Sequence, residues 1–160
     1  MADSLLSLEA VREHMAGNPA VVALASLAVK AKFDRNELTV TVASDNIVAA
    51  AKAVQSAGYN FFEDCTAVDW YPSEPRFQVT YHIVSTTLKE RVRLAVLLDG
   101  DDPSVPSITS VWPSANFYER EVWDLFGIRF PGHPNLTRIM MPTDWKGHPL
   151  RKDYPVEGYR

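Results

Sequence analysis

Cysteine and long apolar runs are both scarce in this chain of 160 residues. Its one cysteine, Cys65, excludes an internal disulfide bond and any iron–sulfur or zinc site that needs several cysteines. No uninterrupted apolar run reaches the roughly 18 residues that a membrane-spanning helix requires. The glycine-rich and serine motifs of nucleotide-binding and hydrolase sites are also missing. We therefore predict a chain that binds no cofactor of its own.

An excess of charge of either sign is missing as well. The formal net charge is −4, with 46% hydrophobic and 22% charged residues, which is typical of one globular domain and indicates neither nucleic acid nor an anionic membrane as a partner. The first residues carry Asp3, Glu9 and Glu13 against Arg12, unlike the basic start of a signal or transit peptide. We expect a chain that is made and used in the cytosol and that reaches a membrane only through partners.

Hydrophobic periodicity predicts the fold class. Alternating apolar positions indicate a hairpin, three further strands and a short sixth strand, over residues 27–42, 61–70, 77–86, 91–98 and 108–112. Helical spacing indicates helices over 5–15, 44–57 and 116–126. Strands joined by short turns, with helices inserted between them, are typical of the α+β class. We predict a mostly antiparallel sheet of five to six strands flanked by helices, with an extended proline-rich C-terminal tail.

The composition divides the chain into two parts. Five of the eleven prolines fall within residues 119–160, where no helical or strand period follows the helix predicted over 116–126. We therefore predict an α+β globular domain over 1–127 and an extended segment over 128–160. This segment also carries large aromatic residues, so it needs a surface to lie on, either its own domain or another protein. We expect it to be mobile in the isolated chain and to become ordered against a partner subunit.

The helix predicted over 116–126 places one acid among apolar residues. At about 100° per residue, Glu119 falls inside the apolar arc, whereas Arg120, Glu121 and Asp124 fall on the opposite side. A buried carboxylate without a partner costs several kcal/mol. We therefore predict that Glu119 is buried and partnered, by backbone amides or by an arginine.

A catalytic reading of the same region is the alternative. Five acidic or imidazole side chains could supply a metal site or an acid/base pair, namely Glu119, Glu121, Asp124, His133 and His148. No two histidines share a helix face, however, and the HExxH motif is missing. A stand-alone metal-dependent or acid/base enzyme that uses the Glu119–His133 region therefore stays open as an alternative function.

The last 40 or so residues resemble a known family. Residues 119–142 read EREVWDLFGIRFPGHPNLTRIMMP, and this run closely resembles the signature of the C-subunit family of respiratory NADH:quinone oxidoreductase, complex I. The family includes mitochondrial relatives and the chloroplast J subunit. Residues 144–155 are similar to the family's tail. One position departs from the pattern, because Thr137 stands where many members carry arginine.

The resemblance implies a function without chemistry in this chain. Family members are structural subunits of the hydrophilic arm of the proton-translocating complex. In that arm, electrons from NADH pass through FMN and iron–sulfur clusters on other subunits to quinone. The resemblance thus implies no catalytic, cofactor-binding or metal-binding residue here, and a peripheral place on the cytoplasmic side of the bacterial inner membrane. The equivalent subunit of a related membrane-bound hydrogenase or ferredoxin-dependent complex is a further alternative.

The resemblance also implies partners and contact residues. The family's members pack against the quinone-site D subunit, and we expect the B and I subunits as further neighbours. The basic side chains of the matched segment offer donors to partner carboxylates, and its aromatic rings offer contact area. The implied interface residues are Glu119, Arg120, Glu121, Asp124, Phe126, Gly127, Phe130, Gly132, His133, Pro134, Arg138, Arg151, Lys152 and Asp153.

Overall fold

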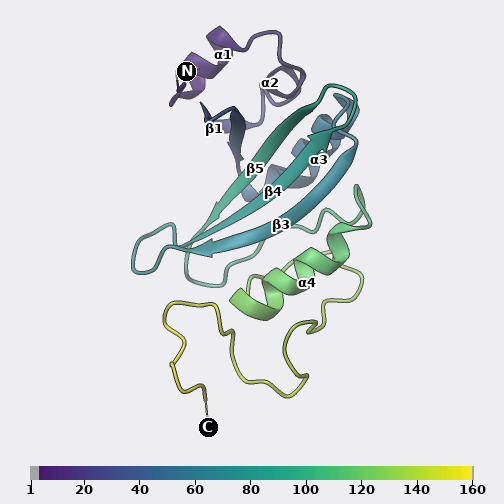
Figure 1. Cartoon of the computed structure of the whole chain (residues 1–160). Coiled ribbons are helices and arrows are strands. Elements are labelled where there is room, and N and C mark those ends of the chain that lie inside the picture. The colour runs from purple at the N-terminus through teal and green to yellow at the C-terminus, as the bar shows by residue number, and fades with distance from the viewer. Residues whose placement is uncertain (1–3, 160) are drawn as a thin grey trace.

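The computed structural model describes residues 4–159 and shows one five-stranded sheet with helices packed against it (Figure 1). The α+β class is confirmed. The strands are β1 (Ala28–Asp34), β2 (Glu37–Val42), β3 (Phe61–Asp69), β4 (Phe77–Ser85) and β5 (Glu90–Leu98). The helices are α1 (Leu8–His14), α2 (Pro19–Ala23), α3 (Ile47–Ser56) and α4 (Ala115–Phe126), and a short 3-10 turn, η1 (Ser44–Asn46), precedes α3. Of these helices, α2 was not predicted from the sequence. No helix within residues 4–159 has the length and apolar character needed to cross a membrane.

The sheet is mixed, because one strand pair is parallel. Its order is β1-β2-β5-β4-β3, in which β2 and β5 run parallel and the three other pairs run antiparallel. The chain leaves β2, passes through α3, forms β3 and β4, and returns as β5 beside β2. The predicted sixth strand around 108–112 is wrong. Its apolar residues Ile108 and Trp112 are buried, but they stand four apart on a turn in which the Trp112 amide donates to the Ile108 carbonyl at 3.0 Å.

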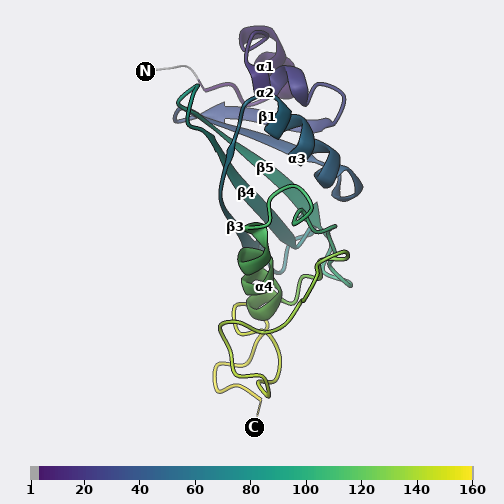
Figure 2. The same ribbon diagram turned by 90° about the vertical axis from the view of Figure 1, so that its right-hand side faces the viewer.

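Only one face of the sheet is covered by helices. Phe62 of β3 packs edge-on against Tyr118 of α4, with ring centroids 5.8 Å apart. Helix α3, which buries Ala50 and Ala51, lies on the same face of the sheet (Figure 2). On the opposite face, Thr66 of β3 and Arg91 of β5 are exposed. This pattern is the alternation expected for an antiparallel sheet with one solvated face. The helix-covered face holds the core.

The chain after α4 lies at the end of the molecule opposite the N-terminal helices (Figure 1). α4 ends at Gly127, whose φ of +76° is the left-handed conformation typical of a helix C-terminus. Beyond it, the described part of the chain consists of turns and one isolated bridge between Arg129 and Ser104. The segment touches its own domain, since the Leu150 amide donates to the Leu125 carbonyl at 3.0 Å. The division at residue 127 and the mobility of the segment stay predictions.

Candidate functional site

Asp124 of α4 organises the loop that follows the helix. Its side chain is buried, and Oδ2 accepts hydrogen bonds from the amides of Ile139, Met140 and Met141 at 2.9, 2.8 and 2.9 Å. Burial would raise its pKa, but these amides and the Arg138 guanidinium together hold the pKa below its usual value. Asp124 thus lies on the side of the helix opposite the apolar arc, and that side is covered at this position. Residues 138–141 fold over that side and bury it.

Arg138 connects α4 to the C-terminal segment. Its Nη1 donates to the carboxylate and to the carbonyl of Asp124, and its Nη2 donates to the carbonyls of Trp145 and Gly147 at 2.9 and 3.0 Å. The guanidinium also lies over the Trp123 ring, 5.7 Å from the centroid. All of these contacts lie within the chain. The Arg138 N–H groups, which the sequence analysis assigned to a partner's carboxylates, thus fix the path of residues 138–147.

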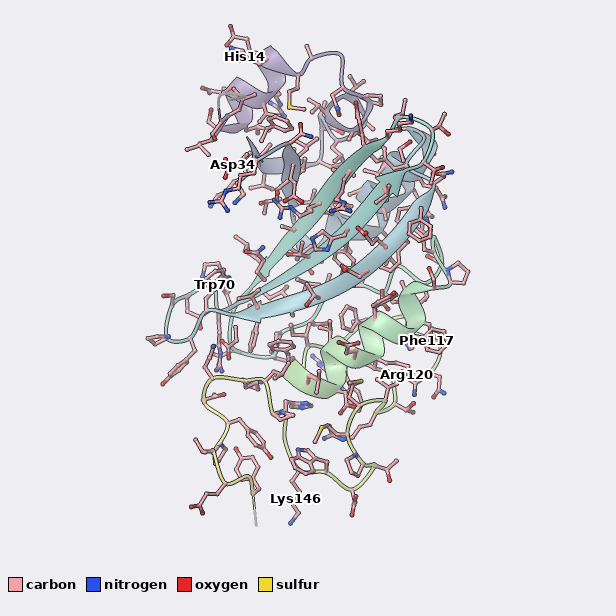
Figure 3. All side chains as sticks on the ribbon, in the orientation of Figure 1. His14, Asp34, Trp70, Phe117, Arg120 and Lys146 are labelled. Atoms are coloured by element: carbon pink, nitrogen blue, oxygen red, sulfur yellow. The ribbon has the colours of Figure 1, made fainter. Side chains whose placement is uncertain are left out.

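Arg120 makes a second connection from α4 to the same loop (Figure 3). Its Nε and Nη2 donate to the carbonyls of Thr137 and Arg138, both at 3.0 Å. Because the contact at Thr137 uses the backbone, it does not depend on the side chain by which this position departs from the family pattern. Two arginines and one aspartate therefore hold the loop on the helix.

Glu119 is fully buried and partnered, as predicted. Its Oε2 accepts from the Ser107 hydroxyl at 2.6 Å, and its Oε1 accepts from the Ile108 amide at 2.8 Å. Neither partner is charged, so burial outweighs these two hydrogen bonds and raises the pKa of Glu119 to about 7. Burial likewise raises the pKa of the nearby Cys65 thiol and Tyr81 phenol well above their usual values. These two groups stay neutral, and the cysteine is the inert thiol expected of a core position.

Residues 103–107, joined to α4 through Glu119, also hold the start of the C-terminal segment. The Val105 amide donates to the Arg129 carbonyl at 3.0 Å, and the Ser107 amide donates to the Pro131 carbonyl at 2.9 Å. Because Ser107 contacts Glu119 as well, the buried carboxyl links α4, this loop and the segment. Phe130, next to these contacts, is buried.

The histidines of the region have structural partners of their own. His148 Nδ1 lies 2.9 Å from the Asp124 carbonyl, and His133 Nε2 lies 3.1 Å from the Asn116 carbonyl. Glu119 contacts neither of them in the hydrogen bonds described above. Across residues 4–159, no group of three or more His, Cys, Asp and Glu side chains could hold a metal ion. The geometry therefore gives no support to an enzyme that uses the Glu119–His133 region.

A buried arginine that the sequence analysis missed connects the segment to the sheet. Arg76 donates to both carboxylate oxygens of Asp69 at 2.9 and 2.8 Å, and to both oxygens of Asp153 at 2.9 and 2.7 Å. The Lys152 amide adds a hydrogen bond to Asp69 at 2.8 Å. Burial alone would raise the pKa of Asp69, but the hydrogen bonds from Arg76 and the Lys152 amide lower it to about 2. Lys152 and Asp153, predicted as interface residues, thus contact the domain itself.

The predicted interface residues differ in exposure. Those buried in the domain are Glu119, Asp124, Phe126 and Phe130; those partly buried are Arg120, Gly127, His133, Arg138 and Arg151; those exposed are Glu121, Gly132, Pro134, Lys152 and Asp153. Four of the fourteen side chains are therefore inside the domain, and the interface role of the set stays a prediction.

The loop held by Asp124 and Arg138 exposes large apolar side chains instead. We call Ile139, Met140, Trp145 and Leu150 the strap residues; each is more than a third exposed. Phe117 of α4 is also exposed and projects away from the sheet (Figure 3). Exposed apolar side chains on a loop fixed by buried polar contacts are typical of a protein–protein interface. The sequence analysis did not select these residues, apart from noting that the segment carries large aromatic residues.

Comparisons with known proteins identify the family. Residues 40–160 match the family described as "Respiratory-chain NADH dehydrogenase, 30 Kd subunit". The C subunit of the NADH-quinone oxidoreductase of Citrifermentans bemidjiense is 47% identical over 146 residues, which are 88% of this chain and 91% of that protein.

Two solved structures are similar in fold and sequence. The trypsin-resistant fragment of Nqo5 has a TM-score of 0.65 and 30% identity, covering 78% of this chain and 99% of that one. A chain of the membrane-bound sulfane sulfur reductase, an archaeal respiratory membrane complex, has a TM-score of 0.76 and 26% identity, covering 90% and 85%. The resemblance seen in the sequence is confirmed: this chain belongs to the respiratory-chain NADH dehydrogenase 30 kDa subunit family, the family of the NADH-quinone oxidoreductase C subunits.

Proposed function

We propose that the chain is a non-redox structural subunit of the hydrophilic arm of a proton-translocating NADH:quinone oxidoreductase. In this proposal, electrons pass from NADH through FMN and iron–sulfur clusters on other subunits to quinone, while this chain supplies no catalytic, cofactor-binding or metal-binding residue. Membership of the C-subunit family and a single buried cysteine support the proposal. The site described above is then a docking surface.

One observation carries the docking role. Asp124 is buried, yet all of its contacts serve to fix a loop whose own apolar side chains stay exposed. Burying a carboxylate is costly unless it is fully hydrogen-bonded, so this arrangement stabilises one particular loop conformation. A loop that is already ordered loses less conformational entropy when it binds a partner. The geometry therefore favours a preformed contact surface made by the strap residues and Phe117.

The expected partners follow from the family. We propose the quinone-site D subunit as the main partner of the strap residues, with the B and I subunits as further neighbours. The complex would place the chain on the cytoplasmic side of the bacterial inner membrane, attached to the membrane only through other subunits. The similar Nqo5 fragment is trypsin-resistant and covers 78% of this chain. This similarity supports the proposal that the chain has a compact domain smaller than its full length.

A related complex is the second candidate. The similar chain in the membrane-bound sulfane sulfur reductase belongs to a respiratory membrane complex whose name gives a substrate other than quinone. Its 26% identity is well below the 47% of the NADH-quinone oxidoreductase relative, and this difference favours the first proposal. Identifying the subunits that co-purify with the tagged chain from its own cells separates the two.

Co-purification with the D subunit tests the docking surface. Met140 and Val22 are both 60% exposed, but Val22 lies on α2 at the other end of the molecule. We expect Met140→Glu to lower the yield of the complex at least about tenfold, because a charge replaces apolar contact area, whereas Val22→Glu leaves it unchanged. Equal yields from both variants would contradict the proposed surface. Flavin or iron–sulfur absorbance in the purified chain would contradict the non-redox role.

A further inference from the structure

Met140 is the most exposed of the methionines that the structure describes. The chain has four methionines, and three of them, Met15, Met140 and Met141, lie within residues 4–159. Met140 is 60% exposed, whereas Met15 packs against the core and Met141 is half-buried. The susceptibility of a sulfur atom to oxidation follows its exposure, because the oxidant must reach it. Exposure therefore distinguishes Met140 both from its neighbour in the chain and from Met15.

The backbone at this position is fixed although the side chain is exposed. The Met140 amide donates to Asp124 Oδ2 at 2.8 Å, and the amides of Ile139 and Met141 donate to the same oxygen at 2.9 Å each. Asp124 is itself buried and paired with Arg138. These hydrogen bonds use only the backbone of residue 140. The side chain can therefore change chemically while the loop keeps its conformation.

Met140 also belongs to the proposed docking surface. It is the most exposed of the strap residues, since Ile139, Trp145 and Leu150 are 39%, 38% and 50% exposed. Oxidation of methionine to the sulfoxide converts a flexible apolar side chain into a polar one and disrupts interfaces that use it. A polar group that is buried against a partner without a hydrogen bond is costly. A change at this one sulfur thus alters the surface that a partner would contact.

We propose that Met140 is a selective site of oxidation by hydrogen peroxide, and that its sulfoxide weakens the docking of the chain to its partner subunit. The effect on docking rests on the proposed function, because it takes the strap residues to be the contact surface. In the reaction, the lone pair of the Met140 sulfur forms a bond to one peroxide oxygen while the O–O bond breaks. The proton of the transferred oxygen passes to the departing hydroxide, which leaves as water. The sulfur is thereby oxidised to the sulfoxide, and the peroxide is reduced.

The consequence of oxidation at Met140 differs from that at a buried methionine. In a core, the added oxygen is a polar atom among apolar groups, and it disrupts the packing. At Met140 the added oxygen has access to water in the isolated chain, so the domain stays folded and only the docking surface changes. Methionine sulfoxide reductases reverse the modification, so docking is restored when the sulfoxide is reduced.

Peptide mapping of the complete chain tests the selectivity without any partner subunit. The chain is treated with hydrogen peroxide, the peroxide is removed, and mass spectrometry measures which methionines have gained an oxygen atom. We expect Met140 to react about fivefold or more faster than Met15 and Met141 in the folded chain, and all three to react at similar rates in urea. A chain oxidised at Met140 alone should keep the melting temperature of the untreated chain to within a few degrees. Equal rates in the folded chain, or loss of the fold on oxidation of Met140, would overturn the proposal.

Binding to the purified D subunit tests the effect on docking. The tagged chain is oxidised, freed of peroxide and mixed with the D subunit, and the bound amount is compared with that of the untreated chain of the same variant. We expect oxidation to lower binding by the wild type at least about tenfold, and treatment with the reductases to restore it. Met140→Leu should lose this sensitivity to peroxide, because leucine has no sulfur. Met141→Leu is the matched control and should stay as sensitive as the wild type.

The outcomes separate this inference from the proposed function. Sensitivity to peroxide that persists in Met140→Leu would overturn the role of Met140, and so would binding that the reductases do not restore in the wild type. The second of these results decides the matter even if Met140→Leu itself binds poorly. Selective oxidation of Met140 with unchanged binding would show that its sulfoxide does not control docking. If the untreated wild type does not bind the D subunit, the proposed partner is wrong, while peptide mapping still decides whether Met140 is the selective site.

Discussion

Asp124 and Arg138, fourteen positions apart, form a buried ion pair that joins the end of α4 to the loop it carries. The Asp124 side chain is inaccessible to solvent, and the Arg138 side chain is only 12% exposed. Removing one partner of such a pair leaves a buried charge without compensation, which is more costly than the pair is stabilising. Both the loop conformation and the stability of the domain should therefore depend on this contact.

The first prediction concerns the charge of Asp124. Asp124→Asn keeps the size of the side chain but removes the charge that compensates Arg138, so we expect a loss of about 3 kcal/mol in the free energy of unfolding at pH 7. The pKa of Asp124 is lowered on folding from 3.8, so its contribution is present above that value and is lost as pH falls through the lowered pKa. Urea unfolding at pH 7 and at acidic pH measures both effects. Glu121→Gln, an exposed change on the same helix, is the control and should stay within about 0.5 kcal/mol.

Glu119 gives a pH dependence of the opposite sign. Its pKa is raised on folding from 4.5 to about 7, so the neutral carboxyl stabilises the fold below pH 4.5, and this contribution is lost as pH rises through 7. Glu119→Gln stays neutral at every pH. We therefore expect the free energy of unfolding of this variant to increase by about 3 kcal/mol relative to that of the wild type as the pH rises from 4.5 to 8. A difference that is constant with pH, measured by urea unfolding across this range, would show that Glu119 is not a buried titrating group.

Truncation of the same side chain has a different consequence. Glu119→Ala leaves the Ser107 hydroxyl and the Ile108 amide without their acceptor in the core. We expect a loss of roughly 3 kcal/mol or more in the free energy of unfolding at pH 5, where the wild-type carboxyl is mainly neutral. Glu119→Gln at the same pH is the matched control, because the amide oxygen can still accept one of these hydrogen bonds.

Alanine substitutions at two glycines of the matched segment allow the cost of backbone strain to be compared with the cost of a side-chain clash. Gly127 and Gly132 have φ values of +76° and +85°, so alanine is strained at both. A Cβ at Gly127 would lie 2.6 Å from the His148 ring, whereas a Cβ at Gly132 would have nothing within 4 Å. We expect Gly132→Ala to cost about 1 kcal/mol and Gly127→Ala to cost clearly more, since His148 must move. Equal losses in thermal or urea unfolding would mean that the His148 side chain shifts without resistance.

The parts of the fold that were predictable from the sequence depend on local patterns. The alternation of Phe77, Val79, Tyr81 and Ile83 predicted β4 because successive side chains of a strand point to opposite faces, whatever the strand pairs with. The parallel pairing of β2 with β5 has no such signal, because it depends on which strands meet across the chain. Likewise, a buried turn and a short strand can have the same pattern of apolar residues over five positions, and this similarity produced the wrong prediction of a sixth strand.

The errors in the site have the same origin. The helical period placed Asp124 opposite the apolar arc and gave no sign of its burial, because a loop fourteen to seventeen positions away buries it. Arg76 was missed although a signal existed. Cys65, Ala67 and Asp69 occupy alternate positions of β3 on its inward face, so the aspartate there required a buried partner. The nearest arginine in the sequence, Arg76, supplies it.

The last prediction concerns how Arg76 holds the C-terminal segment. Arg76 binds two aspartates, but Asp69 is buried within the domain, whereas the Asp153 side chain is 43% exposed on the segment. Arg76→Met should therefore destabilise the whole domain by about 3 kcal/mol or more, because Asp69 is left buried without its cation. Asp153→Asn should change the free energy of unfolding by less than about 1 kcal/mol, because Arg76 keeps Asp69 and the exposed pair is weak.

The same Asp153 variant should release the segment while leaving the domain folded. The peptide bonds after Arg151 and Lys152 are trypsin sites next to this contact, and the Lys152 amide is bound to Asp69. We expect trypsin to cut here several times faster in Asp153→Asn than in the wild type, with the same melting temperature to within a few degrees. Asp144→Asn, a change at an exposed position of the same segment, is the control for loss of one negative charge. If cleavage is equally fast in the wild type and in Asp153→Asn, the Arg76 contact does not restrain the segment; if Asp153→Asn unfolds the domain, the segment belongs to the core and the division at residue 127 is wrong.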